Sequence, residues 1–290
     1  MTTLANIRAG LLAAALLLAA APAAATYSIA ACDRDGNCGV AVATNNLAVG
    51  ATVPYAQARV GALVTQFETN PSYGPKGLAL LASGVAPAQA VQKLLDGDGN
   101  FDGGSIAERQ VGMVSAGGLS ATYTGANAQA ASWAGALHGE GYAVQGNGLA
   151  GERVLAEMRR AYGAAKGSLG ERLMAALEAG ERAGGQRSGK MSAALLVRTV
   201  DGDFQDIDLR VDAAREPVKD LRALVERHYA LQAVVRAEHL VRKGLKAEAQ
   251  ASLAEARCRS QGWERILIRA KGLASAAGLS WSPTTRGCGK

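Results

Sequence analysis

The stretch Ala23-Ala24-Ala25-Thr26-Tyr27-Ser28-Ile29-Ala30 decides how this chain is organised, because it joins an apolar leader to the first alternating segment. A basic residue and the apolar run 11–20 come before it, and the small residues at 23 and 25 form a secretory cleavage pattern. We therefore expect residues 1–25 to be a signal peptide. The mature chain is expected to begin at Thr26, in the periplasm or outside the cell.

Cleavage before Thr26 would place a free α-amine next to the threonine hydroxyl. An α-amine has an ordinary pKa of about 7.7–8.0, so near neutral pH it can accept the hydroxyl proton. An N-terminal threonine is thus a nucleophile and its base in one residue. The sequence predicts Thr26 as a catalytic residue. The alternative is that Thr26 is simply the residue that follows a leader.

The side chains are mostly small, since 49% of the 290 residues are hydrophobic but only 4% are aromatic. We expect one large domain with a core of small residues, alone or with an appendage. After residue 25, no apolar run approaches the roughly 20 residues that span a bilayer. The mature chain is therefore expected to be soluble and exported.

Positive charge is concentrated at the C-terminal end. Residues 215–290 contain 15 Lys and Arg against 7 Asp and Glu, whereas the rest of the chain contains 16 against 18. A basic region can bind an anionic envelope component, although a solvated helix face explains the same charges. Aromatic and basic residues are not interleaved, so nucleic acid is not an expected partner. Homo-oligomers are left open.

The four cysteines predict disulfides in an exported chain. Cys32 and Cys38 flank a tight turn and can face each other across a hairpin, which would leave Cys258 and Cys288 as a second pair. Free thiols and a metal site are the alternatives. The three histidines are scattered and C-x-x-C is absent from the sequence, so we expect neither a metal nor another cofactor.

An acidic, glycine-rich stretch at 96–104 is similar to a calcium-binding loop. Phe101 stands where such a loop requires glycine, and Ala107 stands where it requires glutamate. We therefore expect a surface loop without calcium.

The periodicity of the chain predicts a mixed fold. Alternating residues predict strands over 26–32, 38–44, 59–66, 108–115, 120–124, 141–147, 192–199 and 205–211. Helical periodicity predicts helices over 76–83, 87–95, 152–162, 169–183, 218–243, 246–257 and 263–277. This order is not the strict alternation of a parallel α/β sheet and favours an α+β fold of two antiparallel sheets flanked by helices. Residues 26–214 would form this domain.

The region 215–290 changes to helix only, and its pattern after Gly244 is similar to the second helix of a tetratricopeptide unit. One such unit cannot bury its own apolar face, since about three are normally needed. We therefore expect a basic α-helical C-terminal appendage that packs on the main domain or on a partner.

Several blocks of sequence form a recognisable set. They begin at Thr26-Tyr27-Ser28-Ile29-Ala30-Ala31 and include Val60-Gly61-Ala62-Leu63-Val64-Thr65-Gln66, Asn70-Pro71-Ser72-Tyr73-Gly74-Pro75 and Gly139-Glu140-Gly141-Tyr142-Ala143-Val144-Gln145-Gly146-Asn147. In these blocks the chain resembles domain-of-unknown-function family 1028, which is placed among the N-terminal-nucleophile hydrolases. The resemblance implies a four-layer α-β-β-α sandwich. It also implies an amidohydrolase that acts on a small-molecule or peptide-like substrate through Thr26. A non-catalytic envelope-binding or assembly protein on the same fold is the alternative.

Residues that assist Thr26 in catalysis are expected near the ends of the core strands. Asn147 ends a strand and can donate to an oxyanion, or it can be a turn or cap residue. Thr44 and Asn45 end the second strand, where a partner for the amine would lie.

Arg59 stands about as far along the chain as the lysine that tunes the threonine in proteasome-like relatives, but it can equally be a surface residue. Gln66, Asn70 and Tyr73 are expected to line a pocket, while Asn70 and Tyr73 can equally hold their loop in shape.

Overall fold

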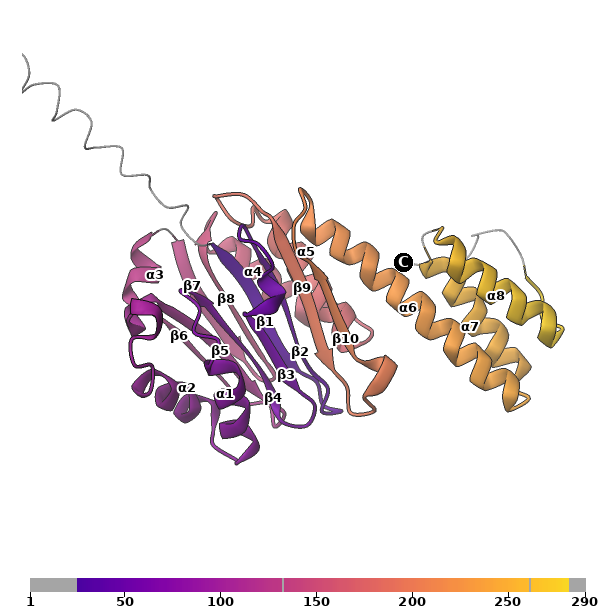
Figure 1. The fold of residues 1–290 in the computed structure, drawn as a ribbon, viewed down its shortest axis with the longest axis horizontal. Coiled ribbons are helices and arrows are strands. Elements are labelled where there is room, and N and C mark those ends of the chain that lie inside the picture. Colours follow the sequence, from indigo (N-terminus) through magenta and orange to yellow (C-terminus); the bar gives the residue numbers. More distant parts are fainter. Residues whose placement is uncertain (1–24, 132, 261, 282–290) are drawn as a thin grey trace, which may run out of the picture.

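The alternating residues after Ala25 form β1 (Thr26–Cys32), an inner strand of a six-stranded antiparallel sheet (Figure 1). The computed structural model describes residues 25–281 except 132 and 261. In this part of the chain the fold is mixed α+β, with two antiparallel sheets and eight helices. Residues 1–24 of the predicted signal peptide and Cys288 lie outside the described residues.

The first sheet has the strand order β10-β9-β2-β1-β8-β7, and the second has the order β3-β4-β5-β6. The remaining strands are β2 (Cys38–Thr44), β3 (Pro54–Gln57), β4 (Gly61–Phe67), β5 (Arg109–Ser115), β6 (Ser120–Thr124), β7 (Trp133–Gly139), β8 (Tyr142–Leu149), β9 (Ser192–Arg198) and β10 (Ile207–Val211). The helices are α1 (Tyr73–Ala82), α2 (Pro87–Asp96), α3 (Ala126–Ala131), α4 (Arg153–Ala164), α5 (Leu169–Arg182), α6 (Pro217–Arg242), α7 (Lys246–Arg259) and α8 (Glu264–Ala277).

Alternate side chains of β1 pack into two different hydrophobic cores. Tyr27 and Ile29 face away from the second sheet and belong to a core with Leu173 and Leu177 of α5. Their neighbour Ala30 lies on the other face, in the core between the two sheets. Both faces of β1 are therefore covered, which explains why its seven residues are all buried.

The second sheet is covered in the same way. Leu63 of β4 and Met113 of β5 pack with helices α1 and α2, for example with Leu81 and Leu94. Val64 and Val114, one position along each strand, face the first sheet. The two sheets thus contact each other, and α1 and α2 cover the other face of the second sheet.

The β1–β2 hairpin is closed by the disulfide Cys32–Cys38, whose two residues are direct cross-strand partners. This confirms the predicted pair. Cys258 is also disulfide-bonded.

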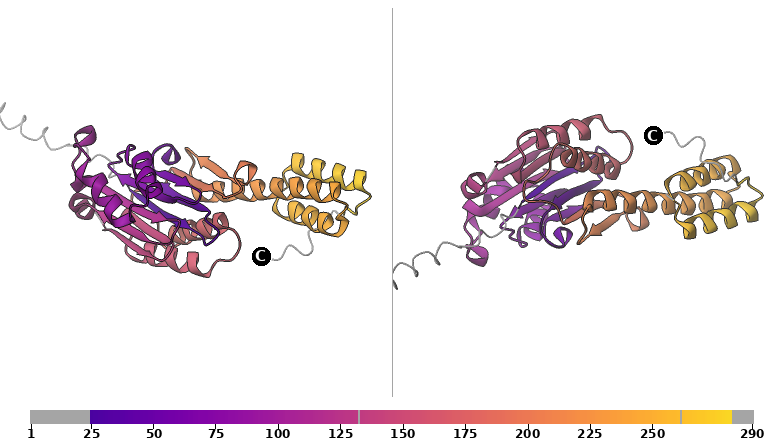
Figure 2. Two further views of the ribbon diagram at one scale, coloured as in Figure 1. Left: turned by 90° about the horizontal axis from the view of Figure 1, so that it is seen from below. Right: turned by 90° about the horizontal axis from the view of Figure 1, so that it is seen from above.

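Helix α6 connects the main body to the C-terminal helices (Figure 2). Its first half contributes Val218, Leu221 and Val225 to the core around β1. Its second half, from Ala230 onward, packs with α7 and α8 in a separate small core. We call α7, α8 and this second half of α6 the bundle. One helix therefore belongs to both parts, and the predicted division between 214 and 215 lies in the connection between β10 and α6.

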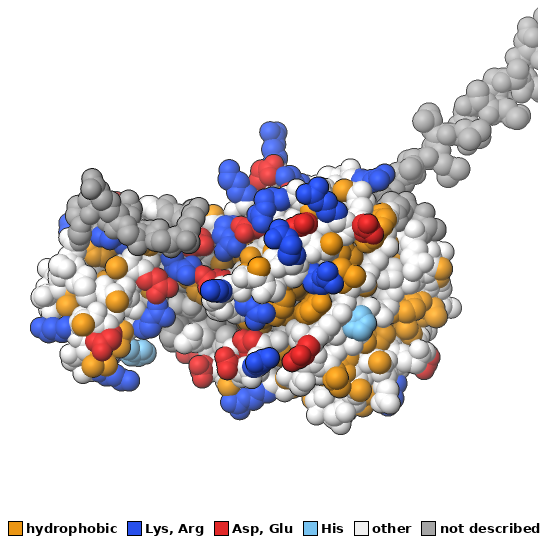
Figure 3. Space-filling model, turned by 180° about the vertical axis from the view of Figure 1, so that it is seen from behind, with side chains coloured by type: hydrophobic (Ala, Val, Ile, Leu, Met, Phe, Trp, Pro, Cys, Tyr) orange, Lys and Arg blue, Asp and Glu red, His pale blue; other side chains and the backbone are white. Residues whose placement is uncertain are grey.

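Ion pairs within the bundle, and between the bundle and α5, neutralise part of its positive charge. Arg236 pairs with Glu255, Arg269 pairs with Glu238, and Arg259 reaches Glu171 of α5 at 2.6 Å. On the face seen in Figure 3, basic and acidic side chains are interspersed. No helix among the described residues has the length and apolarity to span a bilayer.

The prediction missed β3 and β7, which are edge strands. β3 contains Pro54, and β7 reads Trp-Ala-Gly-Ala-Leu-His-Gly, with little alternation. An edge strand is paired on one side only, so its sequence is less constrained by burial.

Replacing Leu173 with Ala should lower the free energy of unfolding by about 2–5 kcal/mol, because it leaves a cavity between α5 and the first sheet. The exposed Leu119 of the β5–β6 turn provides a control, and Leu119→Ala should change stability by no more than about 0.5 kcal/mol. Urea denaturation followed by circular dichroism measures both. Equal losses of unfolding free energy in the two variants would show that the packing of Leu173 against the first sheet is not the source of the effect.

Candidate functional site

The candidate site is a row of three polar side chains across the first sheet. Thr26 of β1 is paired with Thr44 of β2 on one side and with Asn147 of β8 on the other. Directly paired residues of antiparallel strands point to the same face. All three are buried, on the face that looks toward the second sheet.

The Thr44 hydroxyl connects Thr26 to the residue before it. Thr44 Oγ1 donates to the carbonyl oxygen of Ala25 at 2.6 Å and lies 3.1 Å from Thr26 Oγ1. A hydroxyl has one proton to donate. Since Thr44 donates its proton to Ala25, the Thr26 hydroxyl is the donor in the contact between the two threonines.

Asn147 contacts the backbone nitrogen of Thr26 rather than an oxygen. The Thr26 N–H donates to Asn147 Oδ1 at 3.2 Å, and Asn147 Nδ2 donates to Gln110 Oε1 at 2.9 Å. A backbone N–H can only donate, so the atom facing it must be the amide oxygen. This corrects the expectation of an oxyanion donor, because the Asn147 NH₂ group is bonded to Gln110. The geometry suits a residue that orients the Thr26 nitrogen.

Two further groups converge on the Ala25 carbonyl. The backbone N–H of Asn45 donates to it at 3.4 Å, and Gln186 Nε2 donates to it as well. Asn45 Oδ1 also accepts from the Ala25 N–H at 3.2 Å. Sequence reasoning missed Gln186, because it lies in a glycine-rich connection that carries no pattern of its own.

A buried row of amides from the second sheet faces these residues. Gln66 Nε2 donates to the Thr26 carbonyl at 3.3 Å and to Gln110 Oε1 at 2.8 Å. Gln66 Oε1 accepts from Ser28 Oγ at 2.6 Å. Gln66 was expected in a pocket, but it is fully buried and holds the strand that carries Thr26. Gln110 and Ser28 were not predicted.

Arg59 lies far from this row. It is exposed, and its backbone N–H donates to the carbonyl of Gly36 in the β1–β2 turn, at the opposite end of β1 from Thr26. Six residue steps of about 3.3 Å separate the two ends by about 20 Å, beyond the screening length of physiological salt. This placement corrects the expectation that Arg59 tunes the pKa of the Thr26 amine.

Asn70 and Tyr73 belong to a neighbouring buried cluster centred on Asp98. Asp98 accepts from Asn70 Nδ2 at 3.0 Å and from Tyr73 Oη at 2.6 Å. It also forms an ion pair with Arg109 at 2.9 Å, in which both side chains are almost fully buried. Of the two readings of Asn70 and Tyr73, the geometry matches the one in which they hold their loop.

The stretch 96–104 is mostly exposed, as expected of a surface loop, but Asp98 within it is buried and points inward. The Arg109 guanidinium donates to the carbonyls of Glu68, Phe101 and Gly104. One buried arginine thus fixes the two loops that follow β4 and α2. Both loops lie near the end of the sandwich where Thr26 begins β1, since Phe67 and Arg109 are paired there.

Burial alone would raise the pKa of the Asp98 carboxyl. Hydrogen bonds from Arg109, Tyr73 and Asn70, with the charge of Arg109, outweigh burial and lower this pKa to about 2. Burial and the hydrogen bond to Asp98 raise the pKa of Tyr73. Asp98 is therefore a carboxylate and Tyr73 a neutral donor at neutral pH. Among the described residues, no group of three His, Cys, Asp or Glu side chains is placed to hold a metal ion.

The family model described as "Family of unknown function (DUF1028)" matches residues 26–221. The chain belongs to the DUF1028 family. The match begins at Thr26 and ends within α6.

A solved DUF1028 structure has a similar fold. The crystal structure of protein SPO2555 from Silicibacter pomeroyi is 31% identical to this chain, with a TM-score of 0.62. The alignment covers 70% of this chain and 85% of that chain. No curated protein matches this chain.

Asp98→Asn should destabilise the protein by about 3–5 kcal/mol, because it leaves the Arg109 charge buried without its partner. The folded-state pKa of Asp98 lies below its ordinary value of 3.8, so its stabilisation is present above about pH 4 and is lost as the pH falls toward 2. Urea denaturation between pH 2 and pH 6 measures this.

The exposed Asp102 of the same loop is the control, and Asp102→Asn should change stability by no more than about 0.5 kcal/mol at neutral pH. A pH profile of Asp98→Asn as steep as that of the unmodified protein would contradict the assignment to Asp98.

Proposed function

We propose that this DUF1028 protein is an exported amidohydrolase of the N-terminal-nucleophile type, with Thr26 as its first mature residue. One observation carries the proposal: the Thr26 hydroxyl and nitrogen each have a buried partner, Thr44 and Asn147, set by strand register. A threonine in an ordinary strand needs neither partner. The substrate would be a small amide or a peptide-like molecule.

The layer order supports this proposal. The two face-to-face sheets, with α4 and α5 outside one and α1 and α2 outside the other, are compatible with a four-layer α-β-β-α sandwich. In the proposed class the nucleophile begins a strand of an inner sheet, as Thr26 does here. The leader-like sequence before Thr26 supports export and removal of residues 1–25.

In the proposed reaction, the free amine of Thr26 accepts the proton of its own hydroxyl. The hydroxyl oxygen then attacks the carbonyl carbon of the substrate amide. The C–N bond breaks, the leaving amine takes the proton, and the acyl group stays on Thr26 as an ester. Water hydrolyses this ester, returns the hydroxyl and releases a carboxylic acid. Asn147 Oδ1 would hold the amine so that its lone pair points at the hydroxyl.

The groups that bind the Ala25 carbonyl are the proposed oxyanion donors. Loss of Ala25 would release the Thr44 hydroxyl proton, the Asn45 N–H and the Gln186 side-chain amide together. A substrate carbonyl bound beside Thr26 can then take the same donors. Donors that are already oriented stabilise a developing oxyanion at little cost in reorganisation.

The mature secreted protein should begin at Thr26 on N-terminal sequencing. With a panel of small amides, mass spectrometry should find an acyl adduct on the N-terminal peptide, and Thr26→Ala should give none. The matched control is Thr52→Ala, at an exposed position of a turn, which should keep the adduct. A mature chain that begins one residue earlier or later would rule out this mechanism and leave a binding or assembly role.

Thr44→Val keeps the shape of the side chain but removes the proposed oxyanion donor. It should slow acyl-enzyme formation roughly 10²–10³-fold with whichever amide forms the adduct, as the loss of an oxyanion donor does elsewhere. Thr52→Val is the isosteric control and should react at the unmodified rate. An unchanged rate in Thr44→Val would remove Thr44 from the proposed site.

A further inference from the structure

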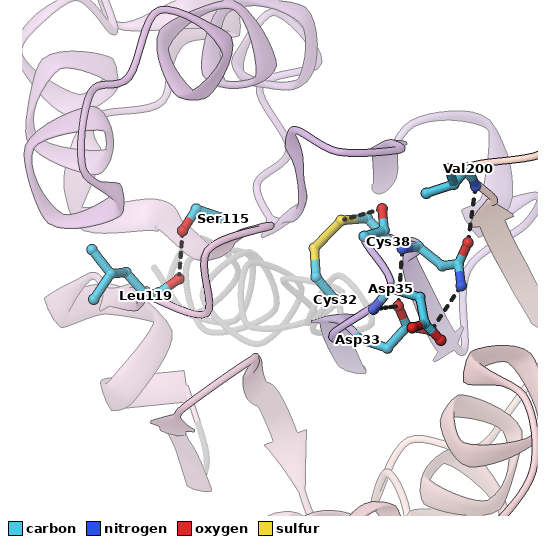
Figure 4. The surroundings of a disulfide bond; sticks show 9 residues. Cys32, Asp33, Asp35, Cys38, Ser115, Leu119 and Val200 are labelled. Atoms are coloured by element: carbon cyan, nitrogen blue, oxygen red, sulfur yellow. Dashed lines mark hydrogen bonds between the residues drawn. A yellow bond between two sulfur atoms is a disulfide. The ribbon is translucent and has the colours of Figure 1, made fainter.

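A cavity of about 740 Å³ lies at the other end of β1 from Thr26. Its walls are the β1–β2, β5–β6 and β7–β8 turns and the connection between α4 and α5. Figure 4 shows two of these walls, with Asp33 and Asp35 beside the disulfide and the turn between Ser115 and Leu119 near it. This volume is in the range of sites for small molecules.

The walls of the cavity are cross-linked to one another. The disulfide closes the β1–β2 turn, and the Cys32 N–H donates to the carbonyl of Gly141 in the β7–β8 turn at 3.0 Å. The Gly141 N–H in turn donates to the carbonyl of Gly118 in the β5–β6 turn at 2.8 Å. Both glycines have positive φ and no side chain to fill the space between the turns. The cavity is therefore a preformed feature of the fold.

Five charged residues line this cavity, two of them basic and three acidic: Arg34, Arg172, Asp33, Asp35 and Glu140. Among the described residues, Arg34, Arg172, Asp35 and Glu140 are in no salt bridge with another part of the protein. Asp33 differs, because its carboxylate accepts hydrogen bonds from Asp35 N and Asn37 N within the turn.

Arg172 has the geometry of a ligand-binding arginine. Its guanidinium lies over the ring of Tyr162, 4.2 Å from the ring centroid, and both residues line the cavity. Stacking on an aromatic ring restricts the guanidinium without using its N–H donors. Those donors suit a carboxylate, which arginine binds through two parallel hydrogen bonds.

The presence of both basic and acidic side chains in the cavity determines which class of ligand it can bind. A simple anion would be repelled by Asp35 and Glu140, and a simple cation would be repelled by Arg34 and Arg172. We propose that this cavity binds a zwitterionic amino acid or short peptide, with its carboxylate at Arg172 and its ammonium group at Asp35 and Glu140. The site is separate from Thr26 and does not depend on the proposed hydrolysis.

The test is calorimetric titration of the mature chain carrying Thr26→Ala, so that turnover cannot consume the probe. The probes are diglycine, N-acetyldiglycine, which lacks the ammonium group, and diglycine amide, which lacks the carboxylate. Diglycine should bind saturably. Each blocked probe should bind at least tenfold more weakly, because it loses one charge-assisted contact.

Arg172→Met keeps the apolar contact with Tyr162 but removes the donors, and Glu140→Gln removes one carboxylate. Each should weaken diglycine binding by about tenfold, with an unchanged melting temperature as evidence that the fold is intact. Arg160→Met is the control, because Arg160 is exposed on α4 and pairs with Glu157 outside the cavity.

Absence of saturable diglycine binding up to about 10 mM would overturn the proposal, since a dissociation constant above that concentration is too weak for a specific binding site. Equal binding of diglycine and N-acetyldiglycine would also overturn it, as would full binding by Arg172→Met.

Discussion

The pairing of β1 with β2 and β8 is the constraint on which the rest of this structure depends. Antiparallel register places Thr26 between Thr44 and Asn147, and it places Cys32 opposite Cys38 at the other end of the hairpin. A shift by one residue would turn all of these side chains to the opposite face of the sheet. The same pairing therefore sets the candidate site, the disulfide and one wall of the cavity at the other end of β1.

The layer between the two sheets is unusual in being polar at one end. Gln66, Gln110 and Asn147 bond to one another and to β1, so their burial is compensated by hydrogen bonds. Gln145 is different, because neither its Oε1 nor its Nε2 has a partner among the described residues. Gln145 lies two residues from Asn147, beside the candidate site.

On the other face of β1, a set of contacts leads from Tyr27 to the start of α6 and to α7. Tyr27, the residue after Thr26, donates to Glu181 at 2.6 Å, and Lys190 bridges Glu181 to Glu216 just before α6. Arg259 of α7 adds its ion pair with α5. The bundle therefore contacts the main body both through α6 and through this ion pair.

The sequence by itself determined the elements whose patterns reflect burial on one or both faces: the hairpin of β1 and β2, its disulfide, the paired helices and the three C-terminal helices. It also singled out Thr26, Thr44, Asn45 and Asn147, because these residues end or begin core strands. Only the tertiary structure decided which atoms meet. It separated Arg59 from Thr26, turned Asp98 inward toward Arg109, gave Asn147 its contact with a nitrogen and brought Gln186 to the Ala25 carbonyl. Local pattern records whether a side chain is buried, whereas its partner depends on strand register and on loops distant in the chain.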